Sequence, residues 1–387
     1  MPRLRERSSR LAGILNPRRW RLTGIFFLCL LLPACNEGPA RPDPYGPSRP
    51  FLMALSSFPA YPAWDAVLQS IDYAAGHADM VVHQHDEGVP WLELSPEGSG
   101  NIPEGLRLEI EERVYESRRA GLGIFLATTP MNNSRDGLAP EWNTGSLPSG
   151  WEDKNFADPS VIVAYTEWCL LLAELYRPDL FAIVIDANIY EEAHPEDWPF
   201  LTSLYDRIYA TIKQRLGDIP VFVTFQMEYL QGSLPLGAEP QWRLLDDFTA
   251  PQDFLALSTY PSLLGLRSDE IETSYFYDAV SEALNSIDAP VLIAETGYPS
   301  EMIFVQGQWL PTSEREQEMY LETLLMAAEL LPVQLVTWFY PFDFSATIEN
   351  DGTRDHFVSM GLNDENTFPK IAFDLWYETW IRPISDN

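Results

Sequence analysis

The stretch Val291-Leu292-Ile293-Ala294-Glu295, followed by Thr296-Gly297, decides the fold class of this chain. Four apolar residues run into one acidic residue, and a turn signal follows. A short apolar run of this kind, bounded by turn residues, is typical of a strand buried in a parallel sheet. Similar runs predict seven further strands, at 51–57, 80–84, 124–128, 182–186, 221–225, 254–259 and 334–339.

Longer amphipathic stretches alternate with these strands. They predict helices near 63–75, 103–119, 158–175, 197–214, 240–248, 274–286, 312–330 and 369–380. Strand–helix alternation repeated eight times predicts a single (β/α)8 TIM barrel of the α/β class. An open doubly wound sheet is the alternative, but Ser56-Ser57-Phe58-Pro59-Ala60 after the first strand lacks the glycines of a phosphate-binding loop.

The N-terminus has the features of an export signal. Residues 1–34 contain seven Arg before a short apolar run, and Leu32-Pro33-Ala34-Cys35 resembles a bacterial lipobox. We therefore expect residues 1–34 to be a lipoprotein signal peptide, 35–50 a lipidated Cys35 with a flexible Pro- and Gly-rich tether, and 51–387 the barrel domain. This predicts a bacterial cell-envelope protein held on a membrane through Cys35, on the outer membrane if the source has one, facing the periplasm or the exterior. An ordinary signal peptide with an incidental cysteine is the alternative.

Charge restricts the class of partner. The 387-residue chain carries 57 Asp and Glu against 25 Lys and Arg, a net charge of −32, and removal of residues 1–34 (seven Arg, one Glu) leaves −38. Such a domain repels nucleic acid, whereas an uncharged polysaccharide is not repelled. We expect a carbohydrate substrate, no nucleic-acid partner and a monomer, although the sequence leaves the oligomeric state open.

In a (β/α)8 barrel the active site forms at the carboxyl ends of the strands. Carboxylates, amides and aromatic rings gather at these positions, whereas Lys is absent from them, which disfavours Schiff-base chemistry. Glu295 and Asp186 are the candidate catalytic pair, because glycoside hydrolysis needs two carboxyl groups across one cleft. The candidate sugar-binding residues are His83, His85, Asp86, Trp91, Asn188, Tyr190, Gln226, Glu228, Tyr260 and Trp338. We expect no cofactor and no metal at this site.

These residues also carry a family resemblance. Ile293-Ala294-Glu295-Thr296-Gly297-Tyr298-Pro299 resembles the nucleophile segment of the large clan of retaining (β/α)8 glycoside hydrolases. Asp186-x-Asn188-x-Tyr190, and the closing segment from Met360 to Trp376, are similar to segments of arabinogalactan endo-β-1,4-galactanase-like proteins. The resemblance implies that Glu295 is a nucleophile, that position 186 holds the acid/base, and that the substrate is a β-linked polysaccharide such as galactan.

One position departs from that pattern, since the family has Glu where this chain has Asp186. The shorter side chain sets the carboxyl back by one methylene, which matters when retaining enzymes hold their carboxyls roughly 5–5.5 Å apart. A compensating backbone shift, an altered mechanism or a carbohydrate-binding lipoprotein without catalysis would each be consistent with it. Glu191 or Glu228 could also replace Asp186 as the acid. A metal-dependent hydrolase, using His83 and His85 as zinc ligands, is a third reading.

Overall fold

The computed structural model describes residues 46–344 and 356–385. The predicted signal peptide, Cys35 and most of the predicted tether lie outside the described residues. The folded body already includes Arg49, which is only 2% exposed and whose guanidinium donates to both carboxylate oxygens of Asp79 at 2.8 Å. Packing therefore starts slightly before the expected domain boundary at residue 51.

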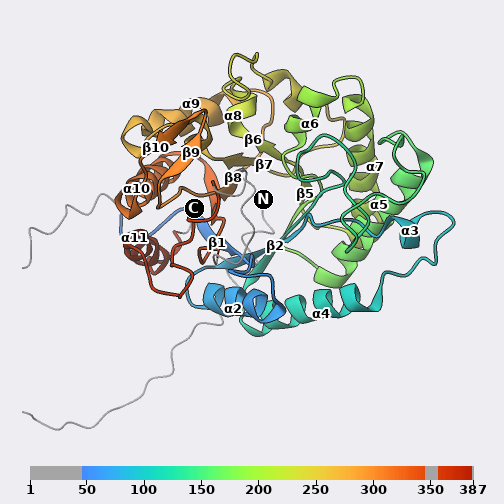
Figure 1. Ribbon diagram of the computed structural model, residues 1–387, viewed down its shortest axis with the longest axis horizontal. Coiled ribbons are helices and arrows are strands. Elements are labelled where there is room, and N and C mark those ends of the chain that lie inside the picture. The colour runs from blue at the N-terminus through green and yellow to red at the C-terminus, as the bar shows by residue number, and fades with distance from the viewer. Residues whose placement is uncertain (1–45, 345–355, 386–387) are drawn as a thin grey trace, which may run out of the picture. The chain divides into compact units, whose positions relative to one another are not determined.

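Nine of the eleven described strands form one parallel sheet that curls into a barrel (Figure 1). Their order is β5-β4-β3-β2-β1-β11-β8-β7-β6. Their bounds are β1 (Leu52–Ser56), β2 (Met80–His85), β3 (Gly123–Thr128), β4 (Leu180–Ala182), β5 (Val221–Phe222), β6 (Thr224–Gln226), β7 (Leu255–Thr259), β8 (Val291–Thr296) and β11 (Val333–Trp338).

The nine strands of this sheet correspond to eight barrel positions. β5 pairs with β4 and β6 pairs with β7, and only Val223 separates β5 from β6. At that residue the backbone N–H bonds the side chain of Gln252, at 2.8 Å, instead of a neighbouring strand. The two sheet edges are thus consecutive parts of one chain segment, which closes the ring and confirms the predicted (β/α)8 barrel.

Helices surround the sheet (Figure 1). The longer ones are α2 (Trp64–Ala75), α4 (Glu104–Arg119), α5 (Pro159–Tyr176), α7 (Trp198–Leu216), α9 (Thr273–Ala283), α10 (Glu314–Leu330) and α11 (Ile371–Trp380), and the short ones are α3 (Trp91–Leu94), α6 (Ala187–Ala193), α8 (Met227–Leu230) and the 3-10 turns η1 (Trp242–Asp246), η2 (Pro261–Leu264) and η3 (Ser268–Glu270). The helix predicted at 240–248 is only the turn η1, because backbone N–H groups on both sides of it bond other parts of the chain: Gln241 donates to the Leu230 carbonyl and Ala250 to the Asp206 carboxylate. Within the described part of the chain, no helix combines the length and apolarity needed to span a membrane.

Two apolar cores lie on opposite sides of the barrel wall. A small inner core fills the barrel with residues such as Val82, Phe125 and Leu292. A larger outer core, which includes Trp168 and Trp338, packs the strands against the helices. Because side chains on a strand alternate between its faces, each strand position is assigned either to the barrel interior, where the site forms, or to the helices.

Candidate active site

A β-bulge turns Glu295 toward the barrel interior. On β8, Leu292 and Ala294 both face inward and Ile293 faces the helices. Strict alternation would then direct Glu295 to the helices as well. Instead, both neighbouring strands skip Ala294: Ser258 of β7 pairs with Glu295, and the pairing with β11 resumes only at Thr296. The extra residue re-aims the side chain that follows it, as bulges beside active sites do.

Two donors hold the Glu295 carboxyl group. The amide of Gln84, which is the inward-facing residue near the end of β2, donates to Oε2 at 2.7 Å. The hydroxyl of Tyr260, which follows β7, donates to Oε1 at 2.5 Å. Hydrogen bonds of this kind favour the ionised form of a carboxyl group. They also fix its orientation, as a nucleophile in a preorganised site requires.

Asp186 approaches the same place from β4. That strand ends at Ala182 rather than at the expected residue 186, and the chain then bends inward. Asp186 itself has φ 51° and ψ 47°, in the left-handed region that Asp tolerates better than most residues. Its N–H donates to Thr224 Oγ1 at 2.8 Å, and its Oδ1 accepts a hydrogen bond from the hydroxyl of Ser258. Since Ser258 is paired with Glu295 on the neighbouring strand, the two carboxyl groups face the same space.

The two carboxyl groups influence each other electrostatically. Burial, and after it the negative charge of Asp186, raises the pKa of Glu295 to about 8. Burial also raises the pKa of Asp186, and the Arg135 guanidinium opposes both shifts. Groups this strongly coupled lose their protons as a pair rather than as individual residues. Each of the two groups is therefore easier to ionise while the other keeps its proton.

Asp86 and Tyr340 lie in the same neighbourhood. The negative charge of Asp86, just after β2, contributes to the raised pKa of Asp186. The charges of Asp86 and Glu295 both contribute to the raised pKa of Tyr340, which follows β11 and whose burial is the main cause of that shift. The structure thus brings together Glu295, Asp186, Asp86 and Tyr260 of the predicted site.

Four predicted sugar ligands are not at this mouth. His83 is fully buried, and its ring nitrogens contact the hydroxyls of Ser57 and Ser117 at 2.9 and 2.8 Å. His85 turns toward the helices as well, where its Nε2 lies 2.8 Å from the hydroxyl of Tyr176 on α5. The other two, Trp91 and Trp338, are fully buried in the outer core, and their indole N–H groups donate to backbone carbonyls.

These contacts argue against the metal-dependent hydrolase. His83 and His85, its proposed zinc ligands, face the helices instead of the barrel mouth. Across residues 46–344 and 356–385 there is also no cluster of three or more His, Cys, Asp or Glu side chains arranged to hold a metal ion.

The other four predicted ligands, Asn188, Tyr190, Gln226 and Glu228, have hydrogen-bond partners within the protein. Asn188 bonds both the N–H and the carbonyl of Gln226, joining the start of α6 to β6. Tyr190 donates to Asp197 at 2.6 Å. Glu228 is fully buried and accepts hydrogen bonds from four donors: the Thr259 and Tyr275 hydroxyls, the N–H of Tyr260 and the amide of Gln226.

Neither substitute acid is available for proton transfer. Glu228 has its carboxylate oxygens occupied by those four donors. Glu191 is buried and forms an ion pair with Arg243 on the turn η1. Of the three acids considered from the sequence, Asp186 is the one that shares the space of Glu295.

Sequence reasoning did not select Gln84, Ser258 or Arg135. Alternation along β2 could have found Gln84, because Met80 and Val82 face the inner core and position 84 follows in the same phase. Ser258 follows Ala256 on β7 in the same way. Arg135 lies in the long loop after β3, where its side chain donates to the Asn132 carbonyl at 2.9 Å, and no periodic pattern marks such a residue.

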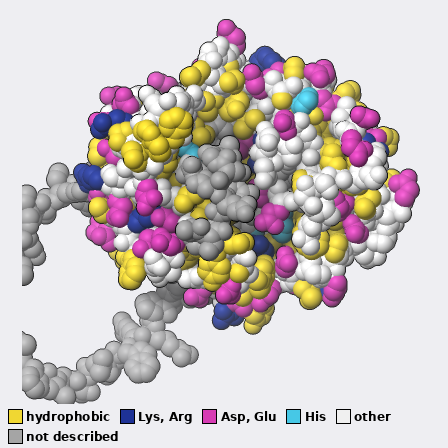
Figure 2. Space-filling model, viewed as in Figure 1, with side chains coloured by type: hydrophobic (Ala, Val, Ile, Leu, Met, Phe, Trp, Pro, Cys, Tyr) yellow, Lys and Arg dark blue, Asp and Glu magenta, His cyan; other side chains and the backbone are white. Residues whose placement is uncertain are grey.

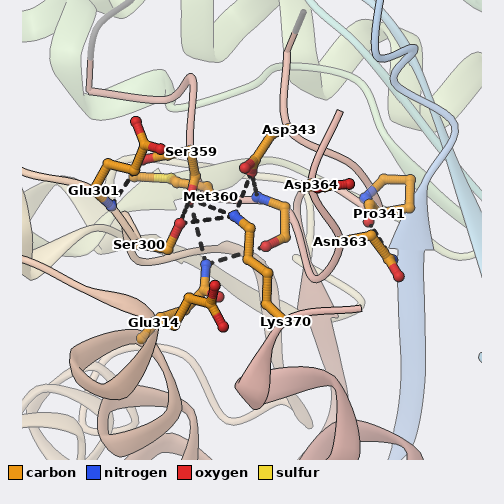
Figure 3. A network of polar contacts seen from close by, with 12 residues as sticks. Ser300, Glu301, Glu314, Pro341, Asp343, Ser359, Met360, Asn363, Asp364 and Lys370 are labelled. Atoms are coloured by element: carbon orange, nitrogen blue, oxygen red, sulfur yellow. Dashed lines mark hydrogen bonds and ion pairs between the residues drawn. The ribbon is translucent and has the colours of Figure 1, made fainter. Parts of the chain in front are cut away.

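A buried ion pair ties the loops beside the mouth together (Figure 3). Lys370, just before α11, contacts the carboxylate of Asp343 at 2.6 Å and donates to the hydroxyl of Ser300 at 2.8 Å and to the carbonyl of Ser359 at 3.1 Å. Asp343 follows β11 and Ser300 follows β8, so one ammonium group links two loops at the carboxyl ends of the strands. Asp343 also accepts from the N–H of Gly361 at 2.8 Å.

Comparison with solved structures gives neighbours that share this fold. A β-glucosidase, 1317, is 12% identical with a TM-score of 0.58, covering 84% of this chain and 89% of its own. GH5_18 from Streptomyces cattleya, in complex with GlcNAc, is 16% identical with a TM-score of 0.63, covering 88% and 83%. The exo-β-1,4-mannosidase Op5Man5 from Opitutaceae bacterium strain TAV5 is 14% identical with a TM-score of 0.62, covering 86% and 59%. At such identities the likeness shows the barrel fold. No family model and no curated protein sequence matches the chain.

Proposed function

We propose that this protein is a glycoside hydrolase acting on β-linked carbohydrate, with Glu295 as nucleophile and Asp186 as acid/base. The observation that carries the proposal is the pair of carboxyl groups on β8 and after β4, which meet at Ser258: this residue is paired with Glu295 and donates its hydroxyl to Asp186. The names of the fold neighbours, a β-glucosidase and an exo-β-1,4-mannosidase among them, support the same reaction class.

We propose the retaining course of this reaction. Asp186, as the acid, gives its proton to the glycosidic oxygen while Glu295 attacks the anomeric carbon and forms a glycosyl-enzyme. Asp186, now ionised, then takes a proton from water, and the water oxygen displaces Glu295. Gln84 and Tyr260 keep Glu295 oriented and favour its ionised form. Arg135 limits the cost of placing two carboxyl groups together.

The substrate is proposed to be a neutral β-linked polysaccharide or oligosaccharide. The strongly acidic chain disfavours anionic polysaccharides, since like charges repel. Galactan is included because the segments 186–190 and 360–376 resemble those of galactanase-like proteins. A Manβ1-4GlcNAc disaccharide is included because a GH5_18 neighbour from Bifidobacterium longum was solved in complex with it.

The test measures reducing-sugar release and aryl β-glycoside hydrolysis by the full chain over a panel of β-linked substrates. The variants are Glu295→Gln, Asp186→Asn and the control Asp288→Asn, whose exposed side chain precedes β8 at the opposite end of the strand. We expect turnover by the wild type and the control, and losses of at least about a thousandfold in Glu295→Gln. Full activity of Glu295→Gln would overturn the assignment. Sugar binding without turnover in every variant would favour the carbohydrate-binding reading instead.

We also propose attachment to the bacterial envelope through Cys35. The proposal rests on the Arg-rich head, the apolar run and the Leu-Pro-Ala-Cys ending. Radiolabelled palmitate should enter the wild-type protein expressed in a bacterial host and should not enter Cys35→Ser. Labelling of both proteins, or of neither, would contradict lipidation at this residue.

A further inference from the structure

A small hairpin beside the site has two chemically different faces. It consists of β9 (Ile303–Val305) and β10 (Gln308–Leu310) and follows β8 in the chain. Ile303 and Leu310 are paired and buried, each 3% exposed. Phe304 and Trp309 are the next pair, and because side chains alternate they occupy the opposite face, 53% and 63% exposed.

The hairpin is attached to the segment that holds Glu295. The side chain of Gln306, at its tip, donates to the carbonyl of Leu263 at 3.1 Å. Leu263 belongs to η2, which begins directly after Tyr260. The hairpin therefore packs on the turn that continues from the residue bonded to the candidate nucleophile.

The base of the hairpin is also held in place (Figure 3). Ser300 and Glu301 donate their backbone N–H groups to the carbonyl and hydroxyl of Ser359, at 2.9 and 3.2 Å. The buried ammonium group of Lys370 donates to the Ser300 hydroxyl. With both its base and its tip bonded to the barrel, the hairpin presents Phe304 and Trp309 from a fixed support.

The exposure of these rings is not explained by packing. Their centroids are 5.3 Å apart with planes at 65°, and Met302 beside them is 59% exposed. Hydrophobic side chains gather on the molecular surface over the β9–β10 region (Figure 2). A fixed apolar cluster of this kind on a protein surface marks a binding surface.

We propose that Phe304 and Trp309 bind sugar units of the polymeric substrate away from the bond that is cleaved. This inference rests on the proposed function. Aromatic rings offer apolar faces to the C–H faces of sugar rings, and the hairpin is joined to the Tyr260 segment of the site. Two other occupants fit less well. The acidic chain repels an anionic lipid surface, and three side chains supply little of the roughly 1,600 Å² that a stable protein interface buries.

The experiment compares the full-length Phe304→Ala/Trp309→Ala variant with wild type and with the control Tyr115→Ala. Tyr115 is 64% exposed on α4, away from the hairpin in the chain. For a β-linked polysaccharide we expect kcat/KM of the double variant to fall about tenfold, through KM, which corresponds to the contact energy of one or two aromatic rings. Hydrolysis of an aryl β-monoglycoside should stay unchanged. Equal loss on both substrates, or no loss on either, would overturn the inference.

A second measurement keeps the inference testable if the wild type turns over no substrate. Binding of β-linked oligosaccharides of two to six units is then followed by calorimetry. Weaker binding by the double variant supports the inference even though the hydrolase proposal fails. Equal binding by both proteins, or none by either, overturns it.

The other occupants are tested directly with the unlipidated Cys35→Ser protein. Co-sedimentation with phosphatidylethanolamine–phosphatidylglycerol vesicles, or self-association in sedimentation velocity, that disappears on changing Phe304 and Trp309 would assign the hairpin to a membrane or to a second copy. Either result would overturn the inference. The inference would be supported if the double variant co-sediments and self-associates to the same extent as the Cys35→Ser protein, while its kcat/KM on the polysaccharide is reduced.

Discussion

The hydroxyl of Tyr260 lies 2.5 Å from Oε1 of Glu295, and the backbone N–H of the same tyrosine donates to Glu228 at 3.0 Å. One residue thus connects the candidate nucleophile to a carboxylate that is fully buried behind it. Glu228 acts on the site through Tyr260, which makes it a positioning residue. The sequence placed Glu228 among the sugar ligands, and the structure assigns it this supporting place.

Tyr260→Phe should raise the pKa of Glu295, because the hydrogen bond from Tyr260 lowers it. A higher pKa leaves less of the nucleophile ionised, so the acidic limb of the kcat/KM profile should move to higher pH. We expect kcat to fall by about 100- to 1,000-fold, the range for loss of one preorganised donor. An unchanged acidic limb, measured on an aryl glycoside from pH 4 to 9, would contradict this role.

Asp186→Asn should lower the pKa of Glu295 from about 8, because the Asp186 charge is one of its causes. The shift can be measured by ¹³C NMR of the labelled glutamate carboxyl group. Asp288→Asn provides a matched loss of one negative charge at an exposed position and should leave this titration unchanged. A pKa that stays near 8 in Asp186→Asn would show that the two carboxyl groups are not coupled.

Glu295→Gln should stabilise the protein at alkaline pH. The folded-state pKa of about 8 lies above the ordinary value of 4.5, so folding favours the protonated carboxyl. Its contribution to stability is fully present below pH 4.5 and is lost as pH rises through 8. The Tm of Glu295→Gln relative to wild type should therefore be higher at pH 8.5 than at pH 4.5. An equal difference at both values would contradict the raised pKa.

Lys370→Met should destabilise the fold strongly, by about 3–5 kcal/mol, because it leaves the Asp343 carboxyl buried without its partner. The double variant Asp343→Asn/Lys370→Met removes both charges and should recover part of the loss. Urea unfolding followed by circular dichroism measures both effects. A double variant less stable than Lys370→Met would rule out the uncompensated charge as the cause.

His83→Ala should affect stability rather than substrate binding. It leaves the hydroxyls of Ser57 and Ser117 without the ring nitrogens that they contact, at a cost of about 1–3 kcal/mol. KM should stay unchanged, since the imidazole lies on the helix side of β2. A raised KM with an unchanged Tm would instead indicate that His83 binds the substrate.

The barrel could be predicted because it depends on a signal repeated eight times. Each buried strand is an apolar run, and a helix pattern follows each of them, so an error at one element changes little. The turn η1 in place of the helix at 240–248 is such an error. Asp186 and Glu295 could be predicted for the same reason. They follow the fourth and seventh predicted strands, and in this fold the carboxyl ends of all strands meet at one mouth.

The side-chain orientations were harder to predict. His83 and His85 were chosen because their chemistry suits a cleft, yet the alternation of β2 directs Gln84 inward instead. The inward turn of Glu295 depends on the skipped pairing at Ala294. The residue types in that segment do not predict a β-bulge, because the bulge depends on the register of β8 with both neighbouring strands. Trp91 and Trp338 were predicted to bind sugar because they are aromatic. Both instead fill the outer apolar core, where a large side chain buries much apolar surface.

The left-handed backbone at position 186 gives the short acid a structural reason. A residue with φ 51° and ψ 47° pays a steric penalty unless it is Gly, Asn or Asp. Asp is the one member of that group with a carboxyl group. An exchange to Glu would lengthen the side chain and at the same time raise the steric strain of the main chain. The bend after β4 thus couples two choices, since the backbone conformation at position 186 and the length of its acidic side chain are set together.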